Sequence, residues 1–303
     1  MRWALPLGLS LSPDAIRAVR ITRRGRRLRV SARRAVPLTR GALTVAPSGL
    51  AITDEGAVLG ALKEALAPGC AEVALAIPDV CCVAQVQRFP ELKARGRELH
   101  ALLLWQAADL LPFPQKEARL ACQVLHREGT AGQVAVLLTH QALLAQLETL
   151  LLRAGTALLF AGSALICLHN AWDSATGGQG SEGLLHLGGG ALGLLLRQDG
   201  RPAFARSVPL ANGDGQAAGI VREVEASLEY ATTREGLPLP PGLLLAGEGE
   251  LPPIARALEE ALRIPVEVLG DEVAAWGAFW EGLPPTAAEA AAAGAALSPG
   301  GGS

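Results

Sequence analysis

The sequence predicts an α/β protein in which one structural plan occurs twice. The chain has 303 residues, enough for two lobes that each bury a core. Half of the residues are hydrophobic and 18% are charged, which excludes a disordered chain. Each half contains a meander of apolar strands, and helices and further strands follow each meander. A duplicated α/β fold is therefore expected.

The first half is predicted to open with a strand meander. Ser12, Pro13 and Asp14 form its first turn, and Thr53 is expected to cap the first helix, with acids in its first turn. Strands are expected at 3–11, 15–21, 28–37, 71–77, 81–88, 120–126 and 133–139. Helices are expected at 53–66, 91–111 and 140–155.

The second half is predicted to repeat this order. Its strands are expected at 184–187, 193–196, 203–208, 243–246 and 266–269. Its helices are expected at 164–172, 216–230, 250–262 and 287–297, the last of them alanine-rich. The predicted boundaries are 1–160 for the first lobe, about 71–155 for a subdomain inserted in it, 161–297 for the second lobe, and 298–303 for a disordered tail.

The charge balance argues against nucleic acid as a partner, because the formal net charge is only −2. Charge is nevertheless unevenly distributed, since the first forty residues hold eleven arginines and a single acid, Asp14. One interpretation is the solvated face of a hairpin. The other is a patch that meets acidic lipid or an acidic partner.

Cysteine usage and hydropathy indicate a protein of the cytoplasm. The five cysteines show no repeated spacing, which argues for a reducing compartment and for core residues over metal ligands. No signal peptide is recognised at the start, and the most apolar stretch, 143–168, is interrupted by Glu148 and Arg153. A cytoplasmic and soluble protein is expected.

Several segments, taken in chain order, resemble the PilM-type proteins of type IV pilus assembly, including the related MshI and HofM groups. The most specific is a helix that ends in Pro112-Phe113-Pro114, with Trp105, Glu117 and Val124 in matching places. The other matching segments are Leu7–Ile21, Gly200–Leu210, Val221–Tyr230 and Leu243–Leu269.

This resemblance implies the duplicated actin-like (ribonuclease H-like) ATPase fold, with two lobes and an α/β subdomain inserted in the first. It also implies a scaffold at the cytoplasmic side of the inner membrane of a Gram-negative-type bacterium, peripheral to the membrane through its partner. That partner is a PilN-like bitopic protein, whose N-terminal cytoplasmic peptide lies in a groove beside the inserted subdomain; other pilus platform proteins are further partners. Trp105, Phe113 and Pro114 are candidates for this groove, and Trp105 and Phe113 alternatively for the core.

In the actin-like group, the two hairpin turns hold the phosphates of ATP, and an aspartate in each binds Mg²⁺ through water. Ser10 and His186 stand at the two aspartate positions here. Neither a hydroxyl nor an imidazole replaces a carboxylate as a magnesium ligand. Ser12 replaces a glycine in the first turn, and the following Pro13 offers no N–H group.

The glycines of the second turn, Gly188 and Gly189, remain, and Gly247 and Gly249 flank the position expected for adenine. A pseudo-ATPase is therefore predicted, with no catalytic residues, no metal site, no cofactor, and at most weak binding of ATP and Mg²⁺.

Two other functions stay open at this point. One is an actin-fold ATPase, or a small-molecule kinase, with an atypical acid such as Asp54, Asp214 or Asp271, although Asp214 lies in a turn-like sequence. The other is the cytoplasmic domain of a type II secretion L-type protein. It is disfavoured because those chains continue into a membrane helix.

Overall fold

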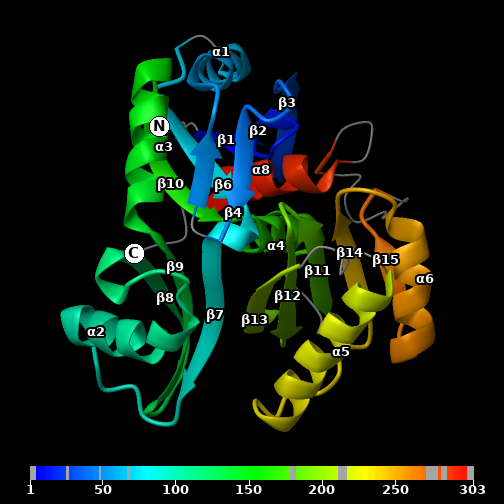
Figure 1. Cartoon of the computed structure of the whole chain (residues 1–303). Helices are drawn as coiled ribbons and strands as arrows, with labels where there is room; N and C mark the ends of the chain where they lie inside the picture. Colours follow the sequence, from blue (N-terminus) through cyan, green and yellow to red (C-terminus); the bar gives the residue numbers. More distant parts are fainter. Residues whose placement is uncertain are drawn as a thin grey trace.

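The computed structural model describes residues 5–24, 27–47, 49–66, 69–177, 182–210, 217–270, 279–280 and 285–298. Two five-stranded sheets with the same topology form its framework (Figure 1). The first sheet has the order β10-β6-β1-β2-β3 and the second β13-β12-β11-β14-β15. In each sheet, three strands form an antiparallel meander and two further strands add in parallel. The duplicated plan predicted from the sequence is confirmed.

The strands of the two sheets follow the predicted order. In the first sheet they are β1 (Leu7–Leu11), β2 (Ala15–Arg24), β3 (Arg27–Pro37), β6 (Glu72–Ile77) and β10 (Ala157–Ser163). In the second they are β11 (Gly183–Gly188), β12 (Ala191–Gln198), β13 (Arg201–Pro209), β14 (Leu243–Gly247) and β15 (Val266–Val268). A small hairpin, β4 (Leu43–Ala46) and β5 (Gly49–Ile52), precedes the first helix.

The helices and sheets alternate in five layers. Helices α1 (Glu55–Ala65) and α3 (Gln141–Ala154) cover the outer face of the first sheet, where they share one apolar core with it. Helices α5 (Ala217–Thr233) and α6 (Leu251–Leu262) cover the second sheet in the same way. Between the sheets lie α4 (Ala164–Thr176) and α8 (Ala287–Leu297), in a core to which both sheets contribute. The two lobes therefore bury apolar surface against a common helical layer.

The alanine-rich composition of α8 follows from this position. A Cβ atom added to Gly8 of β1 would lie 1.8 Å from the carbonyl oxygen of Ala292. One added to Gly294 would lie 1.5 Å from the carbonyl oxygen of Cys167 in α4. Only small side chains allow backbones to approach this closely. Helix α8 has the predicted bounds. It was assigned to the second lobe by its position in the sequence, but it packs against the first sheet as well.

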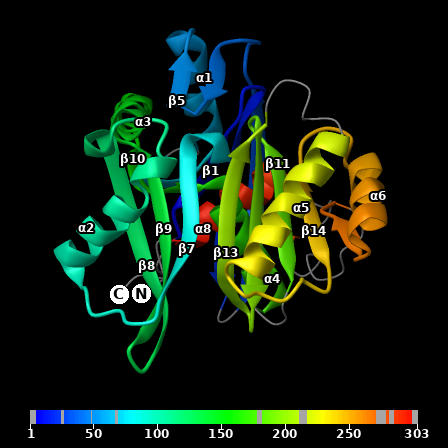
Figure 2. The same cartoon turned by 60° about the horizontal axis from the view of Figure 1, so that its bottom comes forward.

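The inserted subdomain is a separate three-stranded sheet covered by a helix. Its strands are β7 (Cys82–Phe89), β8 (Ala118–Glu128) and β9 (Ala131–His140), in the order β7-β9-β8, and α2 (Gly96–Gln106) completes a core of its own. This unit is narrower than the predicted 71–155, because β6 is a strand of the first sheet and α3 packs on the first core. Figure 2 shows the insert beside the second lobe, where β7 runs alongside β13.

Four local expectations differ from the structure. Strand β10 was not expected, because periodicity alone does not distinguish a strand from a helix in a short apolar run beside a helix. The β4–β5 hairpin lies between the predicted strand 28–37 and the predicted helix 53–66, where no strand was expected. The cap of α1 is Asp54, whose Oδ1 accepts a hydrogen bond from the N–H of Ala57 at 2.9 Å, and not Thr53. Helix α2 begins at Gly96, five residues after the predicted start.

Candidate functional site

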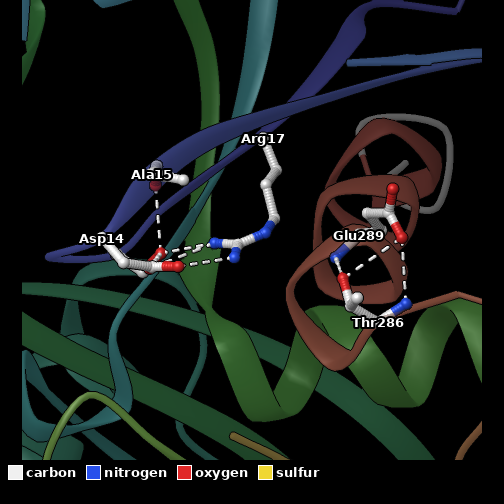
Figure 3. A network of polar contacts seen from close by, with 6 residues as sticks. Asp14, Ala15, Arg17, Thr286 and Glu289 are labelled. Atoms are coloured by element: carbon white, nitrogen blue, oxygen red, sulfur yellow. Dashed lines mark hydrogen bonds and ion pairs between the residues drawn. The ribbon is translucent and has the colours of Figure 1, made fainter. Parts of the chain in front are cut away.

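The first hairpin turn, between β1 and β2, is closed by its own side chains. The hydroxyl of Ser12 lies 2.5 Å from Oδ1 of Asp14 and 3.0 Å from the carbonyl oxygen of Ala15. Arg17 donates to Ser12 Oγ at 2.7 Å and to Asp14 Oδ2 at 2.7 Å (Figure 3). The backbone N–H of Ser12 is bonded to Ala15, and Pro13 has no N–H. Hydrogen bonding to Arg17 lowers the pKa of Asp14, so this carboxylate stays charged and paired.

The N-terminus of α8 lies beside this turn (Figure 3). Thr286 and Glu289 form a reciprocal capping box, in which each side chain accepts a hydrogen bond from the other residue's backbone N–H. Arg33 of β3 lies 3.6 Å from Oε2 of Glu289. The start of this helix is therefore held by contacts within the chain, on the side of the first lobe.

The second hairpin turn, between β11 and β12, contains no comparable side-chain network among the described residues. Gly189 and Gly190 have φ values of +60° and +77°, a conformation that L side chains rarely adopt. A Cβ atom on Gly189 would lie 3.1 Å from Cβ of Pro78, so the turn of the second lobe already touches the first lobe. His186 is buried in β11, at the register position that Ser10 occupies in β1: Ser10 pairs with Ala76 of β6, and His186 with Ala246 of β14.

A buried acid, Asp79, joins the two lobes at this point. Its Oδ2 lies 2.5 Å from Nδ1 of His186, and its Oδ1 accepts a hydrogen bond from the backbone N–H of Leu165 at 2.9 Å. Asp79 is 1% exposed. Leu165 lies in the first turn of α4, where unpaired N–H groups and the helix dipole create a binding position for an anion. A carboxylate of the protein therefore fills the anion position at the N-terminus of α4, where the two lobes meet.

Asp79 was not among the predicted site residues. The sequence places it directly after the apolar strand 72–77 and Pro78, which was interpreted only as the end of a strand. The residue that follows the carboxyl end of a parallel strand commonly lies in the ligand crevice of an α/β sheet, and this rule would have singled it out. Its pairing with His186 joins positions 107 residues apart, which one sequence alone does not reveal.

The structure brings most of the predicted nucleotide residues to one small cavity. Five of them line it: Ser10, Ser12, His186, Gly188 and Gly189. Glu248 also lines it, whereas the flanking Gly247 and Gly249 do not, and the N–H of Glu248 is bonded to the carbonyl oxygen of Leu187. The cavity measures about 30 Å³. Pockets for ligands of nucleotide size enclose about 300–1,000 Å³, so the cleft in this conformation has room for little more than a water molecule.

Thiolate and metal chemistry find no support in this part of the molecule. Burial raises the pKa of Cys81 to about 12, and it also raises the pKa values of Cys82 and Cys167, with the nearby charge of Asp79 adding to the effect. These three thiols are core residues, as predicted, and stay protonated. Among the described residues, no group of three histidine, cysteine or acidic side chains has the arrangement of a metal site.

The candidate groove residues lie on the outside of the insert or at its junction with α3. Trp105 is 71% exposed, so its core interpretation is wrong. Phe113 packs edge-on against the ring of His140, at a centroid distance of 4.8 Å, and Pro114 is exposed. His140 in turn caps α3 and lies 3.1 Å from Oε2 of Glu117. The Pro112-Phe113-Pro114 segment is therefore fixed where the insert meets the first lobe.

Of the atypical acids considered for an ATPase, Asp54 is the cap of α1, while Asp214 and Asp271 lie outside the described residues.

No family model matches the sequence, and no curated protein matches it. Across the described residues, no helix is long and apolar enough to cross a membrane.

The two similar sheets, the shared helical layer and the cleft between the lobes define the actin-like ATPase fold. Comparison with solved structures supports this fold assignment. A protein of Bacteroides thetaiotaomicron with an actin-like ATPase fold and unknown function has a TM-score of 0.52, with 9% identity over 88% of this chain and 91% of that chain. The cytoplasmic domain of EpsL, an inner-membrane component of the type II secretion system of Vibrio cholerae, has a TM-score of 0.51, with 13% identity over 96% and 94%.

A more extensive similarity exists within this class. The PilM-PilN type IV pilus biogenesis complex contains a chain that superposes with a TM-score of 0.76 and 19% identity, over 99% of this chain and 99% of that chain. The fold is therefore PilM-like, as the resemblance in the sequence implied.

Proposed function

We propose that this protein is a non-catalytic component of the inner-membrane platform of a type IV pilus or a related secretion system. The observation that carries the proposal is the match to PilM over the whole of both chains, which includes the inserted subdomain. Similarity of fold alone does not define function, so the residues of two surfaces are considered as well. The residues of the cleft decide whether catalysis is possible, and the residues of the insert decide whether a partner can bind.

The cleft supports the non-catalytic part of the proposal. Phosphoryl transfer requires a metal clamp and donors aimed at the phosphates. Here the first turn is closed by Ser12, Asp14 and Arg17, and Asp79 occupies the N-terminus of α4. The N–H of Leu165 is thus already paired with a carboxylate of the protein and does not remain free for a phosphate.

Titration with a fluorescent ATP analogue, with and without Mg²⁺, tests this part. The expected result is affinity weaker than millimolar and no release of phosphate. Magnesium-dependent affinity in the micromolar range together with turnover would instead establish the alternative, an actin-fold ATPase with an atypical metal site.

The insert supports the binding part of the proposal. Three of the seven exposed large apolar side chains among the described residues lie on the insert, and they are Trp105, Leu110 and Val124. Two more, Leu152 and Leu159, lie at the C-terminal end of α3 and the start of β10, at the end of α3 that is farther from the insert. Strands β8 and β10 are outer strands of their sheets, and an extended peptide can pair with such an edge while its side chains contact apolar residues.

The ligand proposed for this surface is the N-terminal cytoplasmic peptide of a PilN-like bitopic membrane protein. Through this partner the protein would be held at the cytoplasmic face of the inner membrane, beside other platform components. Trp105 and the Phe113-Pro114 segment are the contacts proposed for the peptide. Exposed tryptophan is among the residues that contribute most to binding when a partner covers it.

Isothermal calorimetry with the peptide of the PilN-like protein from the same organism tests the contact. Trp105→Ala should weaken binding by about tenfold or more. Leu239→Ala removes another exposed apolar side chain, one of the second lobe, and should leave binding unchanged. Absence of binding by the unaltered protein would refute the proposed partner.

A further inference from the structure

The strands β2 and β3 continue beyond the rest of the first sheet as a two-stranded ribbon. The pairing of β1 with β2 ends at Val19. From Arg20 onward, β2 pairs with β3 as far as the Arg24–Arg27 pair. We call residues 20–24 and 27–32 the arginine ribbon. Among its described edge groups, the N–H of Val30 is bonded to the carbonyl oxygen of Phe279, which ties the base of the ribbon to the segment before α8.

Arginines lie on both faces of the ribbon, although Ile21, Leu28 and Val30 on one of these faces pack against the interlobe core. Arg29 pairs with Thr22 in the register, which places it on the face that carries Arg20, while Arg23 lies on the opposite face. Arg23 and Arg29 are exposed, and Arg20 is half-buried. Farther along β3, Arg34 donates to the carbonyl oxygen of Glu64 in α1, so its guanidinium group is held against α1 and lies outside the ribbon.

The charge of the protein is divided between its two ends. The first forty residues contain eleven arginines and one acid, a formal charge of +10, so the other residues carry −12 to give the net −2. Exposed acids lie on the outermost helical layer of the second lobe, for example Glu225 and Glu229 of α5 and Glu259 and Glu260 of α6. In Figure 1 this layer is separated from β2 and β3 by the second sheet and the shared helices. Such a charge distribution orients the molecule in front of an anionic surface.

We propose that the arginine ribbon docks directly on an anionic lipid bilayer. Guanidinium groups bind phosphate oxygens in pairs and are more weakly hydrated than ammonium groups, so arginine suits a phosphate-rich surface. Basic residues near an anionic bilayer each contribute to attraction within a Debye length. A bilayer presents phosphates over a broad plane, and this matches arginines spread over both faces of a projecting ribbon. A single anionic ligand would require side chains that converge on one pocket.

The contact would be a second attachment, independent of the protein partner proposed above. A peptide from a bitopic protein would tether the insert, whereas the ribbon would fix the orientation of the first lobe at the same membrane. Two weak attachments to one surface raise the total affinity through effective concentration.

Co-sedimentation with vesicles tests the proposal on the full chain. Vesicles of phosphatidylcholine with about 30% phosphatidylglycerol should bind the protein, pure phosphatidylcholine vesicles should not, and binding should decline steeply between about 50 and 500 mM salt. The triple variant Arg20→Gln, Arg23→Gln and Arg29→Gln should partition at least about tenfold less. A matched triple variant in the insert, Arg95→Gln, Arg97→Gln and Arg119→Gln, removes the same charge from exposed positions and should bind as the unaltered protein does.

Three outcomes would overturn the proposal. The first is no binding to anionic vesicles, and the second is an equal loss of vesicle binding in the two triple variants. The third is binding to polyglutamate or duplex DNA without binding to vesicles. The last would identify an acidic macromolecule as the ligand of the ribbon. Melting temperatures of both variants show whether the fold is retained, and the salt dependence of the unaltered protein gives an answer that needs no variant. Peptide binding by the ribbon variant should stay intact, which separates this proposal from the partner proposed above.

Discussion

The two hairpin turns occupy equivalent places in the two lobes, yet they are built differently. The first is filled by the Ser12, Asp14 and Arg17 side chains, while the second is formed by Gly189 and Gly190 and touches the opposite lobe. Strand order and register are nevertheless the same on both sides. The comparison shows that the fold depends on strand pairing and on the shared helical layer, so the turn chemistry can change without changing the architecture.

The shared layer is attached to the two lobes by different physical means. On the side of the first sheet, α8 approaches so closely that Gly8 has room for no side chain, whereas the equivalent register position of the second sheet holds the buried Leu184. On the second side, α4 contacts a buried arginine: Arg197 lies 3.2 Å from Oδ1 of Asp173 and 4.7 Å from the centre of the Trp172 ring.

The largest expected effect comes from placing leucine at Gly8, so that the first sheet carries the residue that the second sheet has at Leu184. Gly8→Leu would push a side chain into the α8 backbone, and the free energy of unfolding should fall by roughly 4 kcal/mol or more. Denaturant unfolding followed by circular dichroism measures the change. Gly60→Ala in α1 is the matched control, because nothing lies within 4 Å of its added Cβ, and it should stabilise slightly. A stable Gly8→Leu protein would contradict the close approach of α8.

A smaller effect is expected from separating the lobes at the buried pair. Asp79→Ala leaves His186 and the N–H of Leu165 without their partner, and should cost about 3 kcal/mol. His186→Ala should cost less, because the capping bond to α4 survives. The double variant should be less destabilised than the sum of the two single variants, which a double-mutant cycle of unfolding free energies reports. Additive losses would show that the two side chains do not interact.

The sequence was sufficient to predict the duplicated plan, the order of the strands and the position of most helices. The apolar stretch 140–155 and the alanine-rich stretch 287–297 carried that information for two of the helices. It was insufficient where tertiary contacts decide the structure. The sequence at β10 resembles the helices around it, Trp105 has a core-like side chain in an exposed place, and Asp79 acquires its role from a residue on the other lobe.

The candidate site was predictable as a set of positions and not as a geometry. Ser10, Ser12, His186, Gly188 and Gly189 do converge on one cavity. That the turn closes on itself through Arg17, five residues after Ser12, and that Asp79 occupies the helix terminus are consequences of folding.

A third prediction concerns the polar attachment of α4 to the second lobe. Burial lowers the pKa of His169 to about 4, with Arg197 acting in the same direction, while Asp173 and a hydrogen bond to Asn170 oppose the change. The unfolded chain therefore takes up a proton near pH 6.5 that the folded protein does not accept until about pH 4. Stability is fully present above pH 6.5 and is lost as the pH falls toward 4.

Between pH 7 and pH 5 this loss should amount to about 2 kcal/mol, seen as a lower midpoint of denaturant unfolding. His169→Gln should show a shallower decline over the same interval than the unaltered protein. His100→Gln, which changes an exposed histidine of α2, serves as the control and should leave the slope unchanged. An identical slope in all three proteins would show that His169 does not titrate as its burial requires.

The smallest expected effect comes from giving the first turn the residue types that the resemblance to the actin-like group implies for it. Ser10→Asp together with Ser12→Gly would supply the acid and the glycine, yet Pro13 would still lack an N–H and Asp79 would still occupy the start of α4. In both the unaltered and the substituted protein, 1 mM MgATP should therefore stabilise the fold by less than about 0.4 kcal/mol, the value for a Kd of 1 mM. Thermal unfolding with and without the nucleotide measures this. A clear magnesium-dependent increase in Tm for the double variant alone would mean that the turn, and not the Asp79–His186 pair, is what separates this cleft from an ATP site.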